Sequence, residues 1–490
     1  MEPMEPMDAD LAAFDFDTRR IVDGYHENLL IVGTRPEAAR FTGVEAFHTL
    51  TVADSGAPGL GLLSVLEQTG AVRRVHPLAR TPQPTMHPMS MGVVGRIAAT
   101  ARATGEDPLA GTSIVELASG DDVPRVLAAL AEDPAIDFAA RVPVRYLVDG
   151  ASLIAEGKVP LAQPPVGLMM WNLVKIGWEA TRNEPGFVDA DQVSVAVLDT
   201  GIDPEHPDLA HAVEEYVYDY PDGDLPVHLS DRDVEGHGTH VAGTIAAGIG
   251  NGIGIHGMCA ARIHAYKIFD DRLTYIRSLN RFVRVVDPIA YRFALRACYE
   301  SEIEVVNLSI GGRGMPDPTE LKLFRDLVGR GKVVVAAMGN ERAYGSPTSY
   351  PAAIPGVIAV GATGPDDRHA WFSNAGAHIA LSAPGTGIWS TLPTYAGDHG
   401  RGAVVGAGGQ VVPGPTIPRS TDYDVLNGTS MASPHVAAAC ALIVANRGSA
   451  SPADIRQRLE DTAARQTWMS GPADRDYGAG RLDLHAALFA

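Results

Sequence analysis

The chain has 490 residues, of which 46% are hydrophobic and 20% charged, so it is long enough to bury large cores in more than one domain. Its 39 Lys and Arg against 59 Asp and Glu give a formal net charge of −20, which argues against nucleic acid as a partner. No apolar run is long enough to cross a bilayer, so no membrane partner is expected.

The N-terminal part predicts a small mixed domain. Residues 46–75 and 113–140 each read as strand, helix and strand, and two such halves predict an α+β unit of the split, ferredoxin-like type. No fold is predicted for the first 44 residues, which begin with a repeated Met-Glu-Pro. The expected divisions are an unassigned extension (1–44), the α+β domain (45–150), a linker (151–168) and the remainder (169–490).

In the remainder, short apolar strands alternate with helices. This alternation predicts an α/β fold, a parallel sheet with helices on both faces. We expect strands near 193–198, 261–268, 303–308, 332–337 and 357–361, and helices near 237–248, 287–301, 319–329 and 430–446.

Three of these segments carry a carboxylate, an imidazole and a hydroxyl. The first strand ends in Asp199-Thr-Gly, at the end of a parallel strand where ligands and chemistry gather. His237 opens a helix of small residues, and Ser430 opens another. A serine hydroxyl needs a histidine to take its proton and a carboxylate to orient that histidine. The three residues therefore predict nucleophilic catalysis.

The motifs that hold these residues are Asp-Thr-Gly, His-Gly-Thr-His-Val-Ala-Gly-Thr and Gly-Thr-Ser-Met-Ala-Ser-Pro-His, in the chain order Asp, His, Ser. They resemble the subtilisin family of serine proteases, from about residue 170 to the C-terminus. The resemblance implies an endopeptidase that hydrolyses peptide bonds through an acyl-enzyme. It also implies that Asn340 and the backbone N–H of Ser430 bind the oxyanion; in subtilisin itself, loss of that asparagine costs ~10²–10³ in rate.

An extended peptide or protein substrate is expected to pair with the strand that precedes Gly312, main chain to main chain. The resemblance implies that two short stretches line the pocket for the residue before the cleaved bond. They are Ser309, Ile310 and Gly311 on one side, and Ala337 to Gly339 on the other.

Two carboxylates border these pockets by resemblance. Glu341 follows Asn340, and Glu235 lies two residues before His237. A partly buried carboxylate favours a paired cation, so both predict a preference for Lys or Arg in the substrate. Solvated rim charges without such a preference are the alternative.

Structural calcium is the cofactor that the resemblance implies. Carbonyl, carboxyl and amide oxygens suit Ca²⁺. The positions that match the family's site are Asp208, Asn251, Ile253 and Ile255. The ligand that the mature N-terminal arm supplies in relatives cannot be aligned in this chain.

Two further histidines lie in the same motifs. His240 follows His237 on one helix, but the His-Glu-x-x-His pattern of zinc peptidases is absent. His240 and His435 are therefore expected to be structural.

Two segments look inserted. Residues 270–286 are basic and fit a solvated surface insertion or a short amphipathic helix, with contact to the substrate or the N-terminal region as an alternative. Residues 397–418 are rich in Gly and Pro and predict a loop or hairpin near the active site.

The resemblance also implies that the N-terminal region is a propeptide that acts as an intramolecular inhibitor. Its tail, from Tyr146 to Val159, would then occupy the active site and contain a processing point. The alternative is a permanently attached regulatory domain on a latent protease fold.

The cellular compartment is predicted from the number of cysteines and from the N-terminal residues. Cys259, Cys298 and Cys440 are odd in number and read as buried thiols, and no signal peptide is evident. Both observations favour a cytoplasmic protein, with a secreted protein as the alternative.

Overall fold

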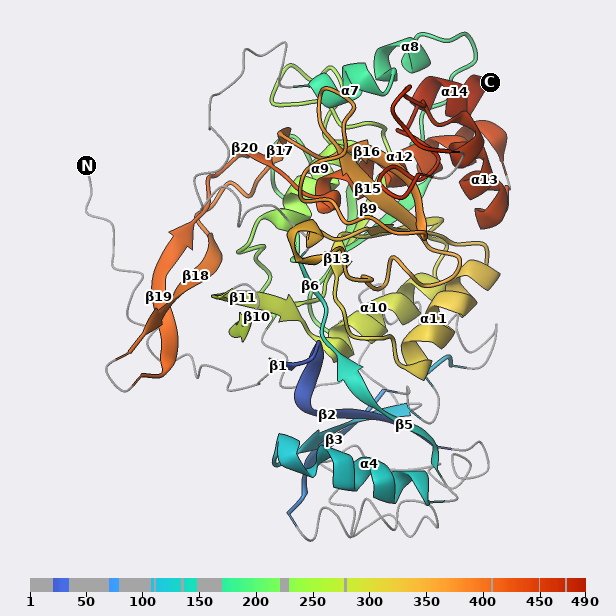
Figure 1. Ribbon diagram of the computed structural model, residues 1–490. Coiled ribbons are helices and arrows are strands. Elements are labelled where there is room, and N and C mark those ends of the chain that lie inside the picture. The colour runs from blue at the N-terminus through green and yellow to red at the C-terminus, as the bar shows by residue number, and fades with distance from the viewer. Residues whose placement is uncertain are drawn as a thin grey trace, which may run out of the picture.

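The computed structural model describes residues 21–34, 70–78, 107–109, 112–133, 136–147, 170–220, 229–276, 280–406, 409–448, 450–471 and 474–490. A large α/β domain forms the upper part of the molecule, and a small antiparallel sheet lies below it (Figure 1). No helix in the described ranges is long and apolar enough to span a bilayer.

The larger domain is built on seven strands: β7 (Ser194–Asp199), β8 (Val213–Val217), β9 (Arg262–Lys267), β12 (Val305–Leu308), β14 (Val333–Ala337), β15 (Ile358–Thr363) and β16 (Ile379–Pro384). All pair in parallel, in the order β16-β15-β14-β12-β7-β9-β8. Successive residues of β7 face opposite sides: Val195 and Val197 pack in one core cluster, whereas Ala196 and Leu198 pack in another. Burial on both faces explains the continuous apolar run in the sequence.

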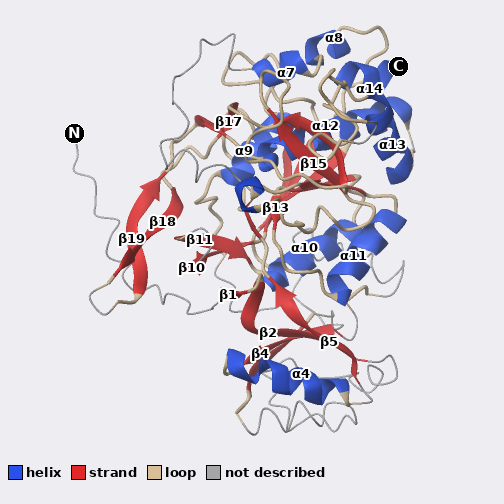
Figure 2. Ribbon diagram, viewed as in Figure 1, coloured by secondary structure: helices blue, strands red, loops and turns tan. Residues whose placement is uncertain are grey.

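Helices cover both faces of this sheet (Figure 2). One core cluster contains residues of α9 (His237–Ala246), α12 (Thr429–Arg447), α13 (Pro452–Thr462) and α14 (Leu484–Phe489), and the other contains α10 (Pro288–Glu300) and α11 (Pro318–Gly329). Two short helices, α7 (Trp171–Lys175) and α8 (Trp178–Arg182), precede β7. The predicted α/β fold class is confirmed, with the expected strands and helices found to within a few residues.

The smaller sheet has β1 (Ile21–Val22), β2 (Tyr25–Thr34), β3 (Val72–Pro77), β4 (Thr112–Leu117) and β5 (Ile136–Pro143). β2 and β4 lie side by side between β5 and β3. The unit β4, α4 (Val123–Ala131), β5 therefore spans the central strand β2, as the split arrangement requires. This unit is the one predicted at residues 113–140.

The first strand of this sheet differs from the expectation. β1 and β2 come from residues 1–44, for which no fold was predicted, so the sheet begins before residue 45. The predicted strand and helix at 46–69 lie outside the described residues, as does the linker 151–168.

The small sheet is buried on both of its faces. Leu30 and Val32 of β2 pack with α4, whereas Leu29 and Ile31 belong to the same core cluster as α10 and α11. The sheet is therefore sandwiched between α4 and the helices of the larger domain, as Figure 1 shows.

Both inserted segments are β-hairpins. Residues 270–286 form β10 (Phe269–Ile276) and β11 (Arg281–Val286) rather than a short helix, and β11 pairs with Tyr146, which confirms the alternative of contact with the N-terminal region. The turn passes through Asn280 with φ of 49°, and the apolar, β-branched residues of β11 favour a strand. Residues 397–418 form β18 (Asp398–Val405) and β19 (Val411–Pro418), which confirms the predicted hairpin.

The remaining short strands lie around the ends of the large sheet: β6 (Tyr146–Leu147), β13 (Ile310–Gly311), β17 (Ile388–Thr391) and β20 (Tyr423–Leu426). β6, β13 and the two hairpins form one antiparallel sheet in the order β13-β6-β11-β18-β19, with β10 also paired to β11. The three cysteines are buried free thiols, as predicted.

Candidate active site

The carboxyl end of β7 meets the first turn of α9. Nδ1 of His237 lies 2.7 Å from Oδ1 of Asp199, and both side chains are buried. The close approach requires glycine at 238, because a Cβ there would lie 2.1 Å from the carbonyl oxygen of Gly201. The structure thus brings together two of the three predicted catalytic residues in hydrogen-bonding contact.

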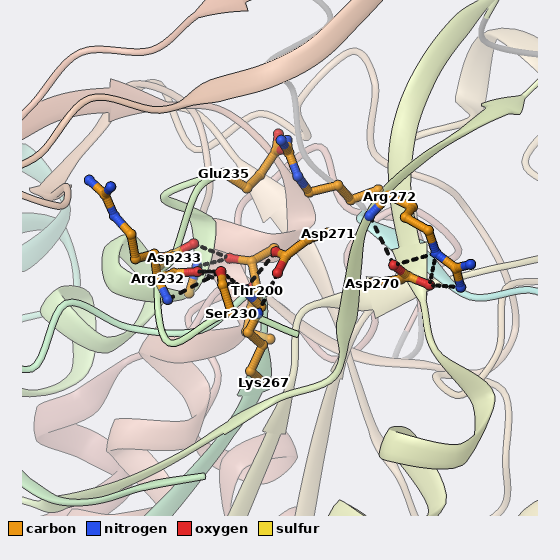
Figure 3. A network of polar contacts seen from close by, with 12 residues as sticks. Thr200, Ser230, Arg232, Asp233, Glu235, Lys267, Asp270, Asp271 and Arg272 are labelled. Atoms are coloured by element: carbon orange, nitrogen blue, oxygen red, sulfur yellow. Dashed lines mark hydrogen bonds and ion pairs between the residues drawn. The ribbon is translucent and has the colours of Figure 1, made fainter. Parts of the chain in front are cut away.

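A second carboxylate, Asp233, holds the loop between these elements (Figure 3). Its Oδ1 accepts hydrogen bonds from Oγ1 of Thr200 (2.7 Å) and N of Gly236 (2.8 Å). Its Oδ2 accepts from N (2.9 Å) and Oγ1 (2.7 Å) of Thr239. Asp233 therefore fixes the residues next to Asp199 and His237. Asp233 was not among the predicted residues; the one signal for it in the sequence is the threonine in each motif, since both donate to this carboxylate.

Ser430 is the second residue of α12, where free N–H groups and the positive end of the helix dipole gather. Its Oγ donates a hydrogen bond of 3.1 Å to the carbonyl oxygen of Ser309. In return, Oγ of Ser309 donates to the carbonyl oxygen of Ser430 at 3.0 Å. Because α12 packs against α9, Ser430 and His237 stand at the starts of two adjacent helices.

The side chain of Asn340 is oriented by the residue before Ser430. Its Oδ1 accepts from N (3.0 Å) and Oγ1 (2.9 Å) of Thr429. Its Nδ2 is buried and has no hydrogen-bond partner in the described structure. A buried donor without a partner is rare and calls for an explanation. An oxyanion formed beside Ser430 would be such a partner.

The strand end before Asn340 forms one wall of the predicted pocket. Ala337 is the last residue of β14, and Gly339 has a φ of 104°. A Cβ on Gly339 would lie 2.3 Å from Nδ2 of Asn374, so only glycine fits. Glu341 accepts hydrogen bonds from Nδ2 of Asn374 (3.1 Å) and from the hydroxyl of Tyr146 (2.6 Å). Burial, together with the Glu341 carboxylate, raises the pKa of Tyr146 above its usual value.

The opposite wall is β13, and a strand from the N-terminal segment lies on it. Leu147 of β6 is opposite Ile310, and Tyr146 is opposite Gly311 and also Val285 of β11. The predicted Ser309 to Gly311 strand is thus paired with the N-terminal segment. Of the predicted tail from Tyr146 to Val159, residues 148–159 lie outside the described residues.

The predicted role of Glu235 in selecting basic substrates needs a carboxylate that a substrate can reach. The structure instead pairs Glu235 with Nη1 of Arg284 (2.9 Å) and Nδ1 of His399 (3.2 Å). Burial alone would raise the pKa of Glu235, but His399 and Arg284 outweigh it and hold the pKa below its usual value. Because these partners come from the two hairpins, the chain itself supplies the cation expected from the substrate.

His240 and His435 are structural, as predicted. Nε2 of His240 lies 3.0 Å from the carbonyl oxygen of Ile388. Nδ1 of His435 donates to the carbonyl oxygen of Met431 (2.8 Å), so its Nε2 accepts from Nδ2 of Asn172 (2.9 Å). Burial lowers the pKa of His240 to about 3 and that of His435 to about 4. Both rings are neutral near pH 7.

The loop expected to bind calcium does not fit the ion as it is arranged. Asp208 accepts hydrogen bonds from Nδ2 of Asn251 (2.6 Å) and N of Ile255 (3.0 Å), whereas Ile253 is largely exposed. Ca²⁺ requires oxygen ligands, but N–H donors face this carboxylate. No group of three or more His, Cys, Asp or Glu in the described ranges is placed to hold a metal ion.

Comparisons with known proteins agree with this geometry. The model of the Subtilase family matches residues 190–480, more than half of the chain. The chain is 36% identical over 304 residues to subtilisin E of Bacillus subtilis (strain 168), covering 60% of this chain but only 65% of that protein. Subtilisin of Bacillus pumilus is also 36% identical over 304 residues, with 90% of its length covered. Subtilisin BL of Lederbergia lenta is 34% identical over 320 residues, with 97% covered.

Among solved structures, the chain matches the crystal structure of fervidolysin from Fervidobacterium pennivorans with a TM-score of 0.58. Fervidolysin is described as a keratinolytic enzyme related to subtilisin. The match covers 96% of this chain and 62% of fervidolysin, at 24% identity, and so shows the fold alone. The family model and the subtilisin relatives, together with the Asp199–His237 pair, show that the chain belongs to the subtilase family.

Proposed function

We propose that the protein is a serine endopeptidase that hydrolyses peptide bonds in peptides or proteins. Ser430 attacks the scissile carbonyl, His237 takes and returns the proton, and Asp199 orients the imidazole and stabilises its charge. Nδ2 of Asn340 and the backbone N–H of Ser430 hold the oxyanion of the tetrahedral intermediate. The acyl group on Ser430 is then released by water.

The observation that carries this proposal is the orientation of Asn340. Thr429 at the start of α12 holds its amide oxygen, which leaves its Nδ2 as a buried donor without a protein partner in the described structure. The test is labelling of the full chain with a fluorophosphonate, which reacts with activated serines. We expect labelling of the wild type and none of Ser430→Ala. Absence of labelling in the wild type, in full-length and in proteolytically trimmed protein, would contradict the proposal.

We further propose that the protein is made as a self-inhibited zymogen. Support comes from β6, which lies between β13 and β11 where an extended substrate is expected to pair, and from the tyrosine that reaches Glu341. A segment in this position excludes a substrate until it is cleaved or displaced.

Mass spectrometry of the intact protein tests this second proposal. We expect a shortened product in the wild type that is absent from Ser430→Ala. If both proteins keep their full length while fluorophosphonate labels the wild type, the alternative holds, and the N-terminal domain is a permanently attached regulator.

A further inference from the structure

Arg145 belongs to the N-terminal segment, yet its side chain is buried in the larger domain. Its Nε lies 3.1 Å from Oε1 of Glu320 and its Nη2 lies 2.8 Å from Oε2. Its Nη1 donates to the carbonyl oxygens of Gly314 (2.9 Å) and Val144 (3.3 Å). The guanidinium is only 2% exposed, so it sits in a closed pocket rather than on a surface.

The pocket itself is made by the larger domain. Glu320 lies on α11 and is fully buried, and the hydroxyl of Tyr291 on α10 donates to its Oε1 at 3.2 Å. The neighbouring Arg292 is paired with Asp317 instead. Within the described structure, Arg145 therefore supplies the charge that balances Glu320. A buried carboxylate that loses its cation is strongly destabilised, so this site favours another cation when the segment leaves.

Arg145, which fills the pocket, lies on the line that a substrate is expected to follow. Arg145 directly precedes β6, and its carbonyl oxygen accepts a hydrogen bond of 2.9 Å from N of Val286. Leu147 is opposite Ile310, so in this register the next residue of a bound chain lies opposite Ser309. The carbonyl of Ser309 accepts the hydroxyl of Ser430. The position of Arg145 is thus three residues before the position beside the nucleophile.

We propose that Glu320, Tyr291 and the carbonyl of Gly314 form an arginine-selective subsite for the peptide substrate, which Arg145 fills in the self-inhibited chain. The inference rests on the proposed peptidase function and adds its substrate class: peptides with arginine three residues before the residue that carries the scissile carbonyl. Arginine is favoured over lysine because its planar fork matches both carboxylate oxygens. An ion pair that only joins two domains would give no such selectivity.

The test uses the full chain with Arg145→Ala, which empties the pocket. The probes are quenched fluorescent peptides that differ only at the third residue before the cleaved one, which is arginine, lysine or citrulline. Citrulline keeps the shape of arginine without its charge. We expect kcat/KM for the arginine peptide to exceed that for the citrulline peptide by about 30-fold or more, the loss typical of an unpaired buried charge.

The matched control is the double variant Arg145→Ala/Glu320→Gln, in which both charges are removed together. We expect it to lose the preference for arginine, so that it cleaves the arginine and citrulline peptides with equal kcat/KM. Equal cleavage of both peptides by Arg145→Ala, with Ser430 labelled by fluorophosphonate, would overturn the subsite. A preference that survives in the double variant would overturn it too. Failure to label Ser430 in the wild type and both variants would overturn the peptidase function, and the subsite with it.

Discussion

At the scale of single residues, Thr429 orients the side chain of Asn340. Its hydroxyl donates to Oδ1 of Asn340 and accepts from N of Gly339 at 3.1 Å. It therefore decides which end of the Asn340 amide faces Ser430. Because Thr429 directly precedes Ser430, it joins Asn340, the proposed oxyanion donor, to the start of the helix that carries the proposed nucleophile.

We predict that substitutions at Asn340 and Thr429 lower kcat to different degrees. Asn340→Ala should lower kcat by ~10²–10³, because the oxyanion loses a hydrogen bond made in the transition state. Thr429→Val should lower kcat on the order of 10-fold, because one hydrogen bond that orients the amide is lost and the backbone one remains. Steady-state kinetics on a peptide amide checks both, with KM nearly unchanged. A wild-type kcat in Thr429→Val would refute the orienting role of Thr429. The control is Thr421→Val, which changes an exposed threonine and should leave kcat at the wild-type value.

The two structural histidines predict sensitivity to acid. In the folded protein the pKa of His240 is about 3 and that of His435 about 4, below the ordinary value of 6.5. The unfolded chain therefore binds protons that the folded chain cannot. The stability is complete above pH 6.5 and falls as the pH drops toward 4, by about 1.4 kcal/mol per pH unit for each ring.

Urea unfolding of the Ser430→Ala protein at pH 7.5, 6.5 and 5.5 measures this loss without self-digestion. The variant His435→Gln should show a shallower dependence on pH, because one of the two groups no longer takes up a proton on unfolding. An unchanged dependence in that variant would mean that His435 is already protonated in the folded state.

At the scale of elements, the hairpin β10–β11 shows where the sequence was insufficient, whereas the hairpin β18–β19 was predicted. Local sequence features were enough to predict β7, α9 and α12. The strand is a continuous apolar run, and each helix begins at a recognisable motif. The hairpin β10–β11 was not predicted, because its pairing partners β6 and β18 lie more than a hundred residues away along the chain. The partners of Glu235 were hidden in the same way, because Arg284 lies 49 residues away along the chain and His399 lies 164 residues away.

The ion pair between β11 and the loop before α9 gives a prediction for Arg284. Arg284→Met leaves the buried Glu235 without its main cation and should lower the free energy of unfolding by about 3–5 kcal/mol. The double variant Arg284→Met/Glu235→Gln should recover most of that loss, since the buried charge of Glu235 is gone and only the partly exposed Asp398, which also pairs with Arg284, loses its cation. Urea unfolding in the Ser430→Ala background measures both. Arg281→Met on the same strand is the control, and an equal loss there would point to the hairpin rather than to the pair.

The loop after α9 gives a prediction about metal removal. Asp208 is satisfied by N–H donors from residues 248, 251 and 255, so the loop is held without an ion. We expect chelation with EDTA to leave the melting temperature of the Ser430→Ala protein unchanged. A fall that added calcium reverses would show that an ion binds the folded state, with Asn251 turned to present its oxygen.

At the scale of the whole molecule, a short stretch of chain joins the small sheet to β6, the strand paired with β13. β5 ends at Pro143, Arg145 enters the pocket at Glu320, and β6 begins at the next residue. The second half of this domain was predicted from its strand, helix and strand pattern. The place of β2 was not, since its apolar residues are buried on both faces and so lack the alternation that marks a half-buried strand.

The proposed self-inhibition predicts that access to Ser430 depends on a contact far from it. Ile31 is fully buried in the core cluster that the small sheet shares with α10 and α11. Ile31→Ala removes part of that packing, and truncations of this kind cost ~2–5 kcal/mol in protein cores. The docked state, with β6 paired to β13, should then be populated less, and the rate of fluorophosphonate labelling of Ser430 in the full chain should rise about 10-fold or more.

The control is Val404→Ala, at the exposed end of β18, which removes a similar side chain without touching this contact. It should label at the wild-type rate. If Ile31→Ala also labels at that rate while its melting temperature falls, the small domain does not control access to Ser430, and exclusion of the substrate rests on β6 and Arg145 alone.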